Sequence, residues 1–395
     1  QQETLTNGYG PEYGRSTGGV ISQVGQSGTN TWHFGAAAFL TPSGTMGDQS
    51  NLYYESNYYP STKGTLYDYR NGNSQWETEY SAYVGGPLIK DKLFFFAAVE
   101  ADRTGSDLVQ PNTTNEEYQT HTTDPKYYVK LDWNINDSNT LSWTSMKNDY
   151  QYGASVYDYD YDTKQEGALS GYLNSEKQEF SANILKFTSY ITDDLTLNAL
   201  IGKMDGTYYY SNPTNSDLPA ILGSSNQNPA YCAGQDCINN QSANTIDSPN
   251  QKSEDRNLRV DLTYKLGDHT LQIGIDNETT NLTDAGTTST GPGYYWDYQT
   301  TTPGSPIVGT SAATSPYVAA INSPYYVEKQ IYTTASSVEV AQRAQFIKDT
   351  WQATPNLLLN IGVRNDQFTN YNPDGEAYVR ETKPQWAPRL GFSWD

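Results

Sequence analysis

The strongest constraint on the fold is an alternation of apolar and polar residues that recurs along the chain. In the segment 125–136, every second residue from Tyr127 to Ile135 is apolar, and the residues between them are mostly polar. The segments 257–266 and 356–366 repeat this pattern. Because successive side chains of a β-strand point to opposite faces, the alternation predicts strands with one apolar and one polar face.

The same reasoning predicts twelve strands over the whole chain. Their expected ranges are 31–40, 75–88, 91–104, 125–136, 138–151, 175–192, 194–209, 254–266, 268–281, 336–353, 355–371 and 385–395. Several of these run for 12 to 18 residues, which is longer than the usual strand of about 5 or 6 residues in globular sheets.

Short and long connections alternate between these strands. Tight turns are expected near 88–92, 134–138, 192–194, 266–269 and 353–356, and long loops near 41–74, 105–124, 152–174, 210–253, 282–335 and 372–384. Strict alternation places all tight turns at one end of the sheet, as in an antiparallel transmembrane β-barrel with short periplasmic turns and long extracellular loops. A secreted β-sandwich, the alternative, would distribute both kinds of connection between its two ends.

Composition excludes several other classes of protein. The formal charge is -21, yet 13% of the residues are aromatic, which predicts a folded chain. The acidic balance argues against nucleic-acid binding and disfavours docking onto an anionic lipid surface. The longest apolar run, 93–99, is far shorter than the roughly 20 residues of a transmembrane helix.

Two cysteines lie close together in one of the predicted loops. Cys232 and Cys237 stand in the segment CAGQDC, and the three histidines are far apart in the sequence. This arrangement gives poor support for a zinc site and predicts a disulfide that closes the loop in an oxidising compartment, with two free thiols as the alternative.

The segment 12–40 resembles the junction between plug and barrel in TonB-dependent outer-membrane receptors, in particular the Oar-like receptors. The resemblance is carried by Tyr-Gly-Arg, Gly-Gly-Val-Ile and Ser-Gly-Thr-Asn at 13–15, 18–21 and 27–30, and two further stretches, 85–103 and 386–395, resemble barrel strands of the family. It assigns five residues to the junction: Tyr13, Gly14, Arg15, Gly18 and Gly19.

The resemblance implies that residues 1–30 are the C-terminal end of a plug domain. Residues 31–395 would then be the first half of a barrel that has 22 strands in the family, and the chain would be part of a longer polypeptide; a natural 12-stranded barrel is the alternative. The TonB box, most of the plug, the N-terminal domain and the last strands of the family are not found in this sequence.

By resemblance, the expected function is import of a ligand through the outer membrane. The ligand would bind at the extracellular loops, and the TonB-ExbB-ExbD complex would move the plug. Alternatives are a surface anchor for adhesion or assembly, a pore without a plug, and, for the β-sandwich, a secreted enzyme. The barrel would also contact lipid and lipopolysaccharide.

Catalysis is not expected from the motifs of the sequence. Residues 14–18 match G-x-S-x-G, but a strand-like segment follows Ser16 where that motif requires a helix. Arg15 is expected inside the barrel, where Glu77, Glu79 and Glu100 are the candidate partners that would neutralise its charge. No other catalytic motif is present, so the chain is predicted not to be an enzyme.

The loop 152–174 contains a candidate for weak calcium binding. Asp158, Asp160 and Asp162 alternate along it, but Thr163 and Leu169 occupy the positions where an EF-hand loop requires Gly and Glu. A solvated hairpin with one face of tyrosines is the alternative interpretation.

Aromatic residues of the loops are candidates for ligand binding. They are Tyr157, Tyr159, Tyr161, Tyr294, Tyr295 and Trp296, with 208–210 as a further tyrosine group, and packing of loop on loop is the alternative. For the barrel wall, Val260, Leu262, Leu359 and Ile361 are predicted to face lipid, whereas Arg259, Asp261 and Arg364 face the lumen. A periplasmic aromatic girdle is expected at Trp133, Trp351 and Trp394.

Overall fold

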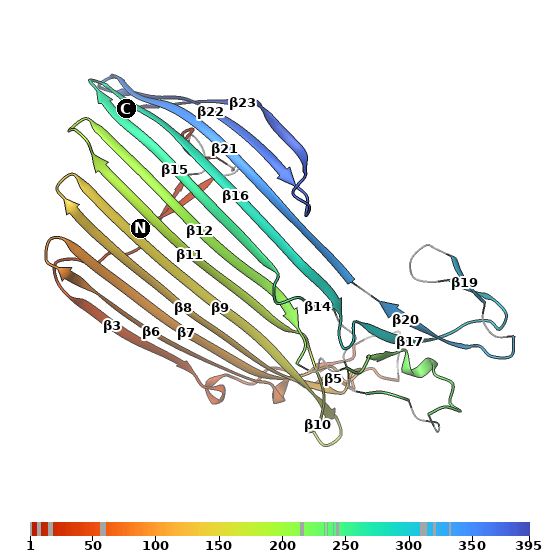
Figure 1. The fold of residues 1–395 in the computed structure, drawn as a ribbon. Coiled ribbons are helices and arrows are strands. Elements are labelled where there is room, and N and C mark those ends of the chain that lie inside the picture. Colours follow the sequence, from red (N-terminus) through yellow and green to blue (C-terminus); the bar gives the residue numbers. More distant parts are fainter. Residues whose placement is uncertain are drawn as a thin grey trace.

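Fourteen described strands form one curved antiparallel sheet in the computed structural model, and twelve of them follow one continuous path (Figure 1). The structure describes residues 2–5, 9–14, 19–55, 61–213, 217–232, 234, 236–239, 241, 245–308, 314–318, 321–331 and 333–395. The twelve strands are β3 (His33–Thr41), β6 (Ser74–Ile89), β7 (Leu93–Val109), β8 (Glu116–Asn136), β9 (Asn139–Asp160), β11 (Ser175–Tyr190), β12 (Leu195–Ser211), β15 (Lys252–Leu266), β16 (His269–Ser289), β21 (Thr333–Thr354), β22 (Leu357–Tyr371) and β23 (Ala377–Trp394). Their order in the sheet follows their order in the chain.

Tight turns lie at one end of this sheet and the long connections at the other (Figure 1). The long connections carry short strands: β4 (Leu52–Tyr53), β5 (Leu66–Asp68), β10 (Gln165–Tyr172), β13 (Ile221–Leu222), β14 (Thr245–Asp247), β17 (Tyr294–Thr300), β18 (Pro306–Val308), β19 (Thr314–Val318) and β20 (Tyr325–Ile331). They also hold three 3-10 turns: η1 (Ser43–Thr45), η2 (Arg70–Gly72) and η3 (Ser224–Asn226). No helix in the described part of the chain has the length and apolarity needed to cross a membrane.

Cross-strand rows show why the alternation of the sequence produces two different faces. Residues paired across neighbouring strands share a face, and one row consists of Leu197, Leu262, Ile273, Ile347, Val363 and Pro388. The next row, on the opposite face, consists of Asn198, Asp261, Gly274, Phe346, Arg364 and Ala387. The first face is outer and the second lines the lumen, so the predicted orientations of Leu262, Asp261 and Arg364 are confirmed.

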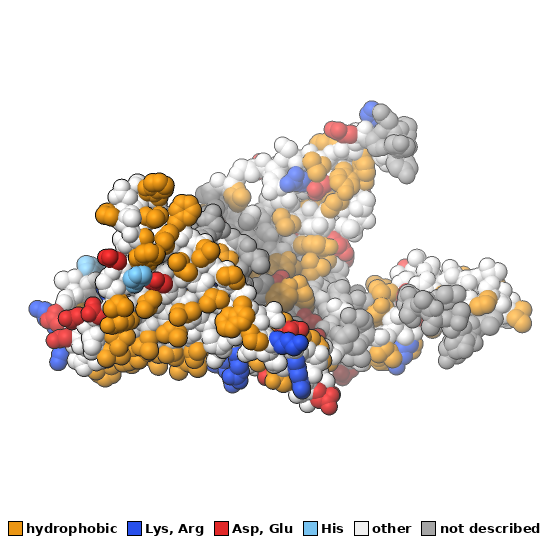
Figure 2. All heavy atoms as spheres, turned by 90° about the horizontal axis from the view of Figure 1, so that it is seen from above, with side chains coloured by type: hydrophobic (Ala, Val, Ile, Leu, Met, Phe, Trp, Pro, Cys, Tyr) orange, Lys and Arg blue, Asp and Glu red, His pale blue; other side chains and the backbone are white. Residues whose placement is uncertain are grey.

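The outer face is exposed and apolar, whereas the luminal face is polar and partly covered. Leu262 is 39% exposed, but Asp261 is 5% exposed and Arg364 is fully buried. Figure 2 shows hydrophobic side chains gathered over the outer wall. The three predicted girdle residues, Trp133, Trp351 and Trp394, all lie at the tight-turn end, and the Trp351 ring stacks on His269 with centroids 5.1 Å apart.

Several strands extend farther than their hydropathy predicted. β8 begins at Glu116 rather than near 125, β9 continues to Asp160, β16 continues to Ser289, and β23 begins at Ala377. Parts of four predicted loops are therefore strand. At this end of the sheet the two faces no longer differ in polarity, so the alternation disappears while the hydrogen-bonded pairing of the backbone continues.

The N-terminal residues lie on the luminal side, apart from the large sheet. β1 (Gln2–Leu5) and β2 (Val20–Gln23) pair only with each other, in antiparallel orientation. Residues 24–32 then lead into β3 at the edge of the sheet (Figure 1).

Candidate functional site: the lumen of the barrel

Residues 9–14, here called the docked segment, lie against the luminal face of the last five strands. The segment contains a tight turn in which Tyr13 N donates to Gly10 O at 3.2 Å, and Pro11 at the second turn position suits this geometry because its φ is fixed. Pro11 is fully buried and Glu12 is 9% exposed. A Cβ at Gly362 of β22 would lie 2.5 Å from Pro11 Cγ, so the missing side chain of Gly362 makes room for the turn.

Three arginines of the barrel bind four consecutive carbonyl groups of the docked segment. Arg389 Nη1 donates to Gly10 O and to Tyr13 O, both at 2.6 Å. Arg364 Nη1 donates to the Pro11 carbonyl at 3.3 Å, and Arg259 Nη1 donates to the Glu12 carbonyl at 3.1 Å. The arginines come from β23, β22 and β15, so three separate strands hold one turn.

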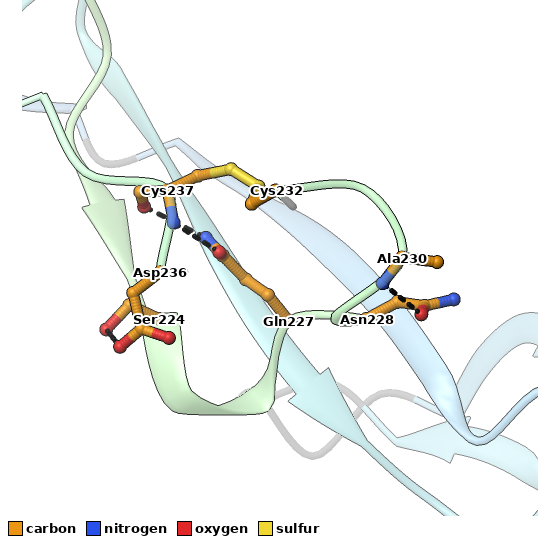
Figure 3. The surroundings of a disulfide bond; sticks show 7 residues. All are labelled: Ser224, Gln227, Asn228, Ala230, Cys232, Asp236 and Cys237. Atoms are coloured by element: carbon orange, nitrogen blue, oxygen red, sulfur yellow. Dashed lines mark hydrogen bonds between the residues drawn. A yellow bond between two sulfur atoms is a disulfide. The ribbon is translucent and has the colours of Figure 1, made fainter. Parts of the chain in front are cut away.

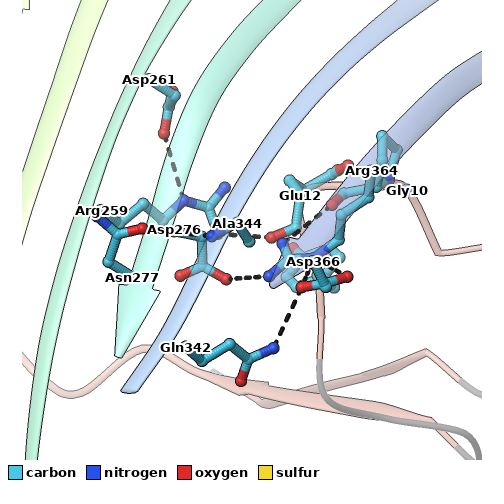
Figure 4. Close-up of polar contacts among 12 residues, drawn as sticks. Gly10, Glu12, Arg259, Asp261, Asp276, Asn277, Gln342, Ala344, Arg364 and Asp366 are labelled. Atoms are coloured by element: carbon cyan, nitrogen blue, oxygen red, sulfur yellow. Dashed lines mark hydrogen bonds and ion pairs between the residues drawn. The ribbon is translucent and has the colours of Figure 1, made fainter. Parts of the chain in front are cut away.

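Carboxylates of the wall neutralise the most buried of these arginines (Figure 4). Arg364 Nη2 lies 2.9 Å from Asp276 Oδ2, and its Nε lies 2.9 Å from Asp366 Oδ1. Arg259 pairs with Asp261 at 3.4 Å. Because an unpaired buried charge is strongly unfavourable, these carboxylates allow the guanidinium groups to lie in the lumen.

A side-chain ion pair completes the contact between the docked segment and the wall. Glu12 Oε1 lies 2.6 Å from Lys348 Nζ on β21. The guanidinium of Arg389 lies over the Tyr9 ring, 5.0 Å from its centroid. The contact is thus mainly polar, and its strongest members are hydrogen bonds from charged groups.

Among the predicted junction residues, Tyr13 and Gly14 belong to the docked segment. A Cβ at Gly14 would overlap the guanidinium of Arg364, so only glycine fits at this distance. Gly19 immediately precedes β2. Arg15, Ser16, Thr17 and Gly18 lie outside the described residues, so the predicted partners of Arg15 stay a prediction; one of them, Glu100, pairs with Lys126 at 2.8 Å.

The Ser-Gly-Thr-Asn segment at 27–30 ties the luminal residues to the first tight turn. Asn30 Nδ2 donates to Asp91 Oδ1 at 2.6 Å, and Asp91 N donates to Asn30 Oδ1 at 2.9 Å. Asp91 has a positive φ of 63°, a conformation that few side chains adopt readily. A Cβ at Gly28 would overlap the carbonyl oxygen of Phe95, so the segment packs directly on the backbone of β7.

At the long-loop end, the tyrosines of the 152–174 loop pack between loops. Tyr159 is 6% exposed, and its ring meets the Tyr161 ring edge-to-face at 5.4 Å. The Tyr161 hydroxyl donates to the Gln110 carbonyl, and the Lys164 ammonium lies 5.1 Å from the Tyr161 ring centroid. Burial raises the pKa of the Tyr161 hydroxyl. Tyr157 lies on β9 together with Tyr159 and is half-buried.

The three aspartates of the same loop are arranged around a turn. Asp160 Oδ1 accepts hydrogen bonds from Asp162 N at 2.8 Å and from Thr163 N at 3.1 Å, and Asp158 lies on β9 opposite Glu116. Within the described ranges, no group of three His, Cys, Asp or Glu residues is arranged to hold a metal ion. Calcium binding stays a prediction of the sequence.

The second predicted aromatic group lies on β17, which pairs with β13 and β20. Tyr294 and Trp296 meet edge-to-face at 5.6 Å, and the Lys329 ammonium lies 3.9 Å from the Tyr294 ring centroid. Tyr295 alternates with them and points to the other side of the strand. Among the residues that the structure describes, no hydrogen bond or ring contact joins this group to the tyrosines of 157–161.

A disulfide between Cys232 and Cys237 closes a small loop between β13 and β14 (Figure 3). Their Cα atoms are 5.8 Å apart. Gln227 spans the loop: its Nε2 donates to Cys237 O at 3.0 Å, and Cys237 N donates to its Oε1 at 2.6 Å.

The sequence prediction did not identify a groove on the luminal wall just below the loops, here called the luminal rim. It has a volume of about 290 Å³, and its lining includes Asn148, Gln178, Phe180, Tyr208 and Leu282. Phe180 is 41% exposed and Tyr208 is 44% exposed. Tyr208 belongs to the tyrosine group at 208–210 that the sequence proposed for ligand binding, whereas Phe180, which shares the luminal face with it, was not proposed.

The barrel arginines were also only partly foreseen. Arg259 and Arg364 were predicted to face the lumen, but Arg389 and Lys348 were not singled out as partners of the N-terminal segment. Lys348 and Arg389 could have been proposed from their positions. Both lie on the luminal face opposite Gly362, on the two strands next to β22.

Comparisons with known proteins agree with this architecture. Residues 104–395 match the family described as outer membrane beta barrel domain. The chain is 24% identical to the TonB-dependent transporter Oar of Myxococcus xanthus, over 98% of this chain and 41% of that protein. The chain therefore spans less than half the length of this relative.

Solved structures show the same fold at low sequence identity. The outer membrane transporter YddB from Escherichia coli superposes with a TM-score of 0.57 at 13% identity, covering 100% of this chain and 45% of that one. The siderophore receptor PirA from Acinetobacter baumannii superposes with a TM-score of 0.50 at 14% identity, and the match covers 100% of this chain and 45% of the receptor chain. The chain therefore belongs to the outer membrane beta barrel domain family, is located in the outer membrane, and resembles TonB-dependent transporters.

Proposed function

We propose that this chain forms part of a gated transporter in which the docked segment belongs to the gate. The observation that carries the proposal is the capture of four consecutive carbonyls by Arg389, Arg364 and Arg259. These contacts are strong enough to hold the lumen closed at rest. They are also individually separable, because each hydrogen bond can exchange with water as the segment is drawn away.

The energy for opening would come from a TonB-ExbB-ExbD complex, as the resemblance to TonB-dependent transporters suggests. Pulling on the N-terminal side would detach Gly10 and Pro11 first. The Glu12 and Lys348 pair would follow. Apolar packing of the same area would instead have to yield as one unit, so the polar contact suits stepwise release.

We also propose that the luminal rim receives the ligand after the loops have admitted it. Phe180 and Tyr208 offer exposed rings for stacking, and the amides of Asn148 and Gln178 offer hydrogen bonds beside them. This combination suits a ligand with a flat apolar face edged by polar groups, such as a sugar ring. The loop tyrosines at 159 and 161 contribute mainly to packing, because they are buried or engaged with Gln110.

The relatives are described as transporters and receptors, and we propose that this chain likewise catalyses no reaction. A surface anchor is the competing function. It needs the loops and the wall but no movable segment, so the two functions differ in what happens inside the lumen.

The gate is tested in cells by sensitivity to vancomycin, a hydrophilic antibiotic too large for general pores. The double variant R259Q/R389Q loosens the docked segment and is expected to make cells more sensitive. Cross-linking cysteines in E12C/K348C, placed where the native side chains meet at 2.6 Å, is expected to protect them. R380Q, on β23 but without a contact to the docked segment among the described residues, serves as the control.

Two results would count against the gate. Equal sensitivity of wild type and R259Q/R389Q would mean that these contacts do not close the lumen. Sensitivity unaffected by an uncoupler of the proton gradient in wild-type cells, together with unchanged loop-mediated adhesion, would favour the anchor.

A further inference from the structure

A second cavity, here called the lower luminal cavity, lies between the N-terminal residues and the wall of the barrel. It has a volume of about 660 Å³ and is enclosed by residues 23–25 on one side and by β8, β9, β11 and β12 on the other. A Cβ at Gly25 would lie 2.1 Å from the Tyr128 hydroxyl oxygen, so the segment 23–25 approaches the wall directly. The cavity is therefore partly covered from the lumen.

The lower luminal cavity follows the luminal rim along the same strands. Lys186 of the cavity pairs with Leu200, and Leu200 pairs with Arg259, whose guanidinium reaches the docked segment, so all three share the luminal face. From Phe180 at the rim to Lys186, β11 runs toward its tight turn for about 20 Å at roughly 3.3 Å per residue. A ligand that moves from the rim toward the periplasm along β11 meets this cavity next.

Two lysines give the cavity a positive charge. Lys186 is exposed, and within the described ranges its ammonium group has no hydrogen bond or ion pair. Lys130 Nζ donates to Ser27 Oγ at 2.8 Å and lies 3.5 Å from Asp132 Oδ1, to which Ser142 Oγ also donates at 2.6 Å. An ammonium group has three donors, so one donor of Lys130 stays available. Two cations thus share one carboxylate, in a chain whose formal charge is -21.

The rest of the wall combines apolar side chains with one hydroxyl group. Met146, Ile184 and Leu200 line the cavity beside the lysines, and Thr144 lies between them on the cross-strand row of Lys130 and Ile184. Pockets of this kind bind a ligand by apolar contact and orient it with a few polar groups.

We propose that the lower luminal cavity is a second binding site for the transported ligand and that this ligand is a ring carrying an anionic group, either a carboxylate or a phosphate, as in an acidic sugar. The ammonium groups of Lys130 and Lys186 would bind the anionic group through charge-assisted hydrogen bonds, and the ring would lie against Ile184 and Leu200. The inference rests on the proposed transport function, because a ligand reaches this cavity only through the lumen. It adds a negative charge to the flat ring that the luminal rim suits.

The test is protection of lysines from acetylation in the intact protein, extracted from outer membranes into a non-ionic detergent. Acetic anhydride labels accessible amines, and mass spectrometry of the peptides measures each lysine separately. Glucuronate and glucose 6-phosphate are the anionic probes and distinguish a carboxylate from a phosphate, whereas glucose is the uncharged probe. At least one anion is expected to protect Lys186 at a concentration about tenfold or more below that of glucose, because charge-assisted hydrogen bonds are the stronger ones.

Two variants separate the site from the general charge of the lumen. K186Q should raise the concentration of the protecting anion that half-protects Lys130 by about tenfold or more. K126Q is the matched control, because Lys126 is a luminal lysine on the same strand as Lys130 whose ammonium is already paired, with Glu100 at 2.8 Å and Asp124 at 3.2 Å. K126Q should be protected as wild type is.

The measurement is repeated in R259Q/R389Q, so that a closed lumen cannot hide the site. Absence of protection by both anions in wild type and in this variant would overturn the proposal, and so would equal protection by glucose or an equal loss in K126Q and K186Q. Inorganic phosphate that protects as well as the sugar anions would also overturn it, because the apolar wall would then contribute nothing.

This outcome can be told apart from that of the proposed gate. Protection is measured on extracted protein and needs no energised membrane, whereas the gate is tested in cells with vancomycin. Protected lysines together with an unchanged vancomycin sensitivity of R259Q/R389Q would refute the gate alone. Unprotected lysines together with the expected vancomycin result would refute the anion site alone.

Discussion

Replacing Arg389 with glutamine should loosen the docked segment without disturbing the barrel. Arg389 holds Gly10 O and Tyr13 O at 2.6 Å and lies over the Tyr9 ring. Hydrogen bonds from a charged donor contribute about 1.5 to 3 kcal/mol each, and the ring contact about 0.5 to 1 kcal/mol. Glutamine keeps at most one neutral bond of about 1 kcal/mol, so even the low ends of these ranges leave a net loss of about 2.5 kcal/mol.

A loss of this size makes the segment open about a hundred times more often, because 1.4 kcal/mol corresponds to about a factor of ten. Hydrogen exchange of the backbone amides in residues 9–14, followed by mass spectrometry, reports this opening directly. No carboxylate pairs with Arg389 in the described part of the chain, so R389Q leaves no orphaned charge and the wall should keep its exchange rates.

The control is R380Q, which removes a charge from the same strand at a position that does not contact the docked segment in the described structure. It should exchange like wild type. If R389Q also exchanged within about a factor of two of wild type, the carbonyl contacts would contribute too little to hold the segment, and the reasoning would be refuted.

Three further predictions concern the wall, the first turn and the loops. L262R should impair barrel assembly, because an arginine on the lipid face costs about 2 to 4 kcal/mol at the bilayer centre, whereas D261N should not. Assembly is measured by the heat-modifiable mobility of the protein on gels, and equal tolerance of the two substitutions would contradict the assigned faces. N30A should lower the free energy of unfolding by about 1 to 3 kcal/mol through its two bonds with Asp91, measured in urea, with T31A as control; an unchanged midpoint would exclude the anchoring role. Burial raises the Tyr161 pKa, so its packing is favourable below the usual pKa of about 10 and is lost as the pH rises through the raised value. An ultraviolet titration of Y161F should therefore lack one late-ionising tyrosine, and a curve identical to wild type would contradict this.

The twelve strands could be predicted because one face of each meets lipid and the other meets the lumen. Because of this difference, apolar and polar residues alternate in the sequence, as at 258–266, where the apolar residues all lie on the outer face. At 116–124 both faces are polar, and at 152–160 buried apolar residues occur on both faces, with Val156 on one and Tyr159 on the other. Neither segment alternates in hydropathy, although the backbone continues to pair. The ends of the strands could therefore not be predicted from hydropathy.

The luminal site was predictable in its location but not in its contacts. The motif at 13–15 and 27–30 marked a junction, and Gly14 and Gly28 are indeed positions where a side chain would overlap the wall. The bonds from Arg364 and Arg389 end on carbonyl oxygens, which every residue has, so no residue type reveals them. In the loops, hydropathy could not distinguish Tyr159, which is buried, from Tyr208, which is exposed.

The most direct test of the central claim is whether the docked segment leaves the lumen when cells are energised. In Y13C, the new thiol replaces a half-buried side chain of the docked segment, on a residue whose carbonyl accepts a hydrogen bond from Arg389. Its labelling by a maleimide too large to enter the closed lumen is measured in respiring cells, with and without an uncoupler of the proton gradient. The gate predicts faster labelling in respiring cells than in uncoupled cells, whereas the same slow rate in both would contradict it.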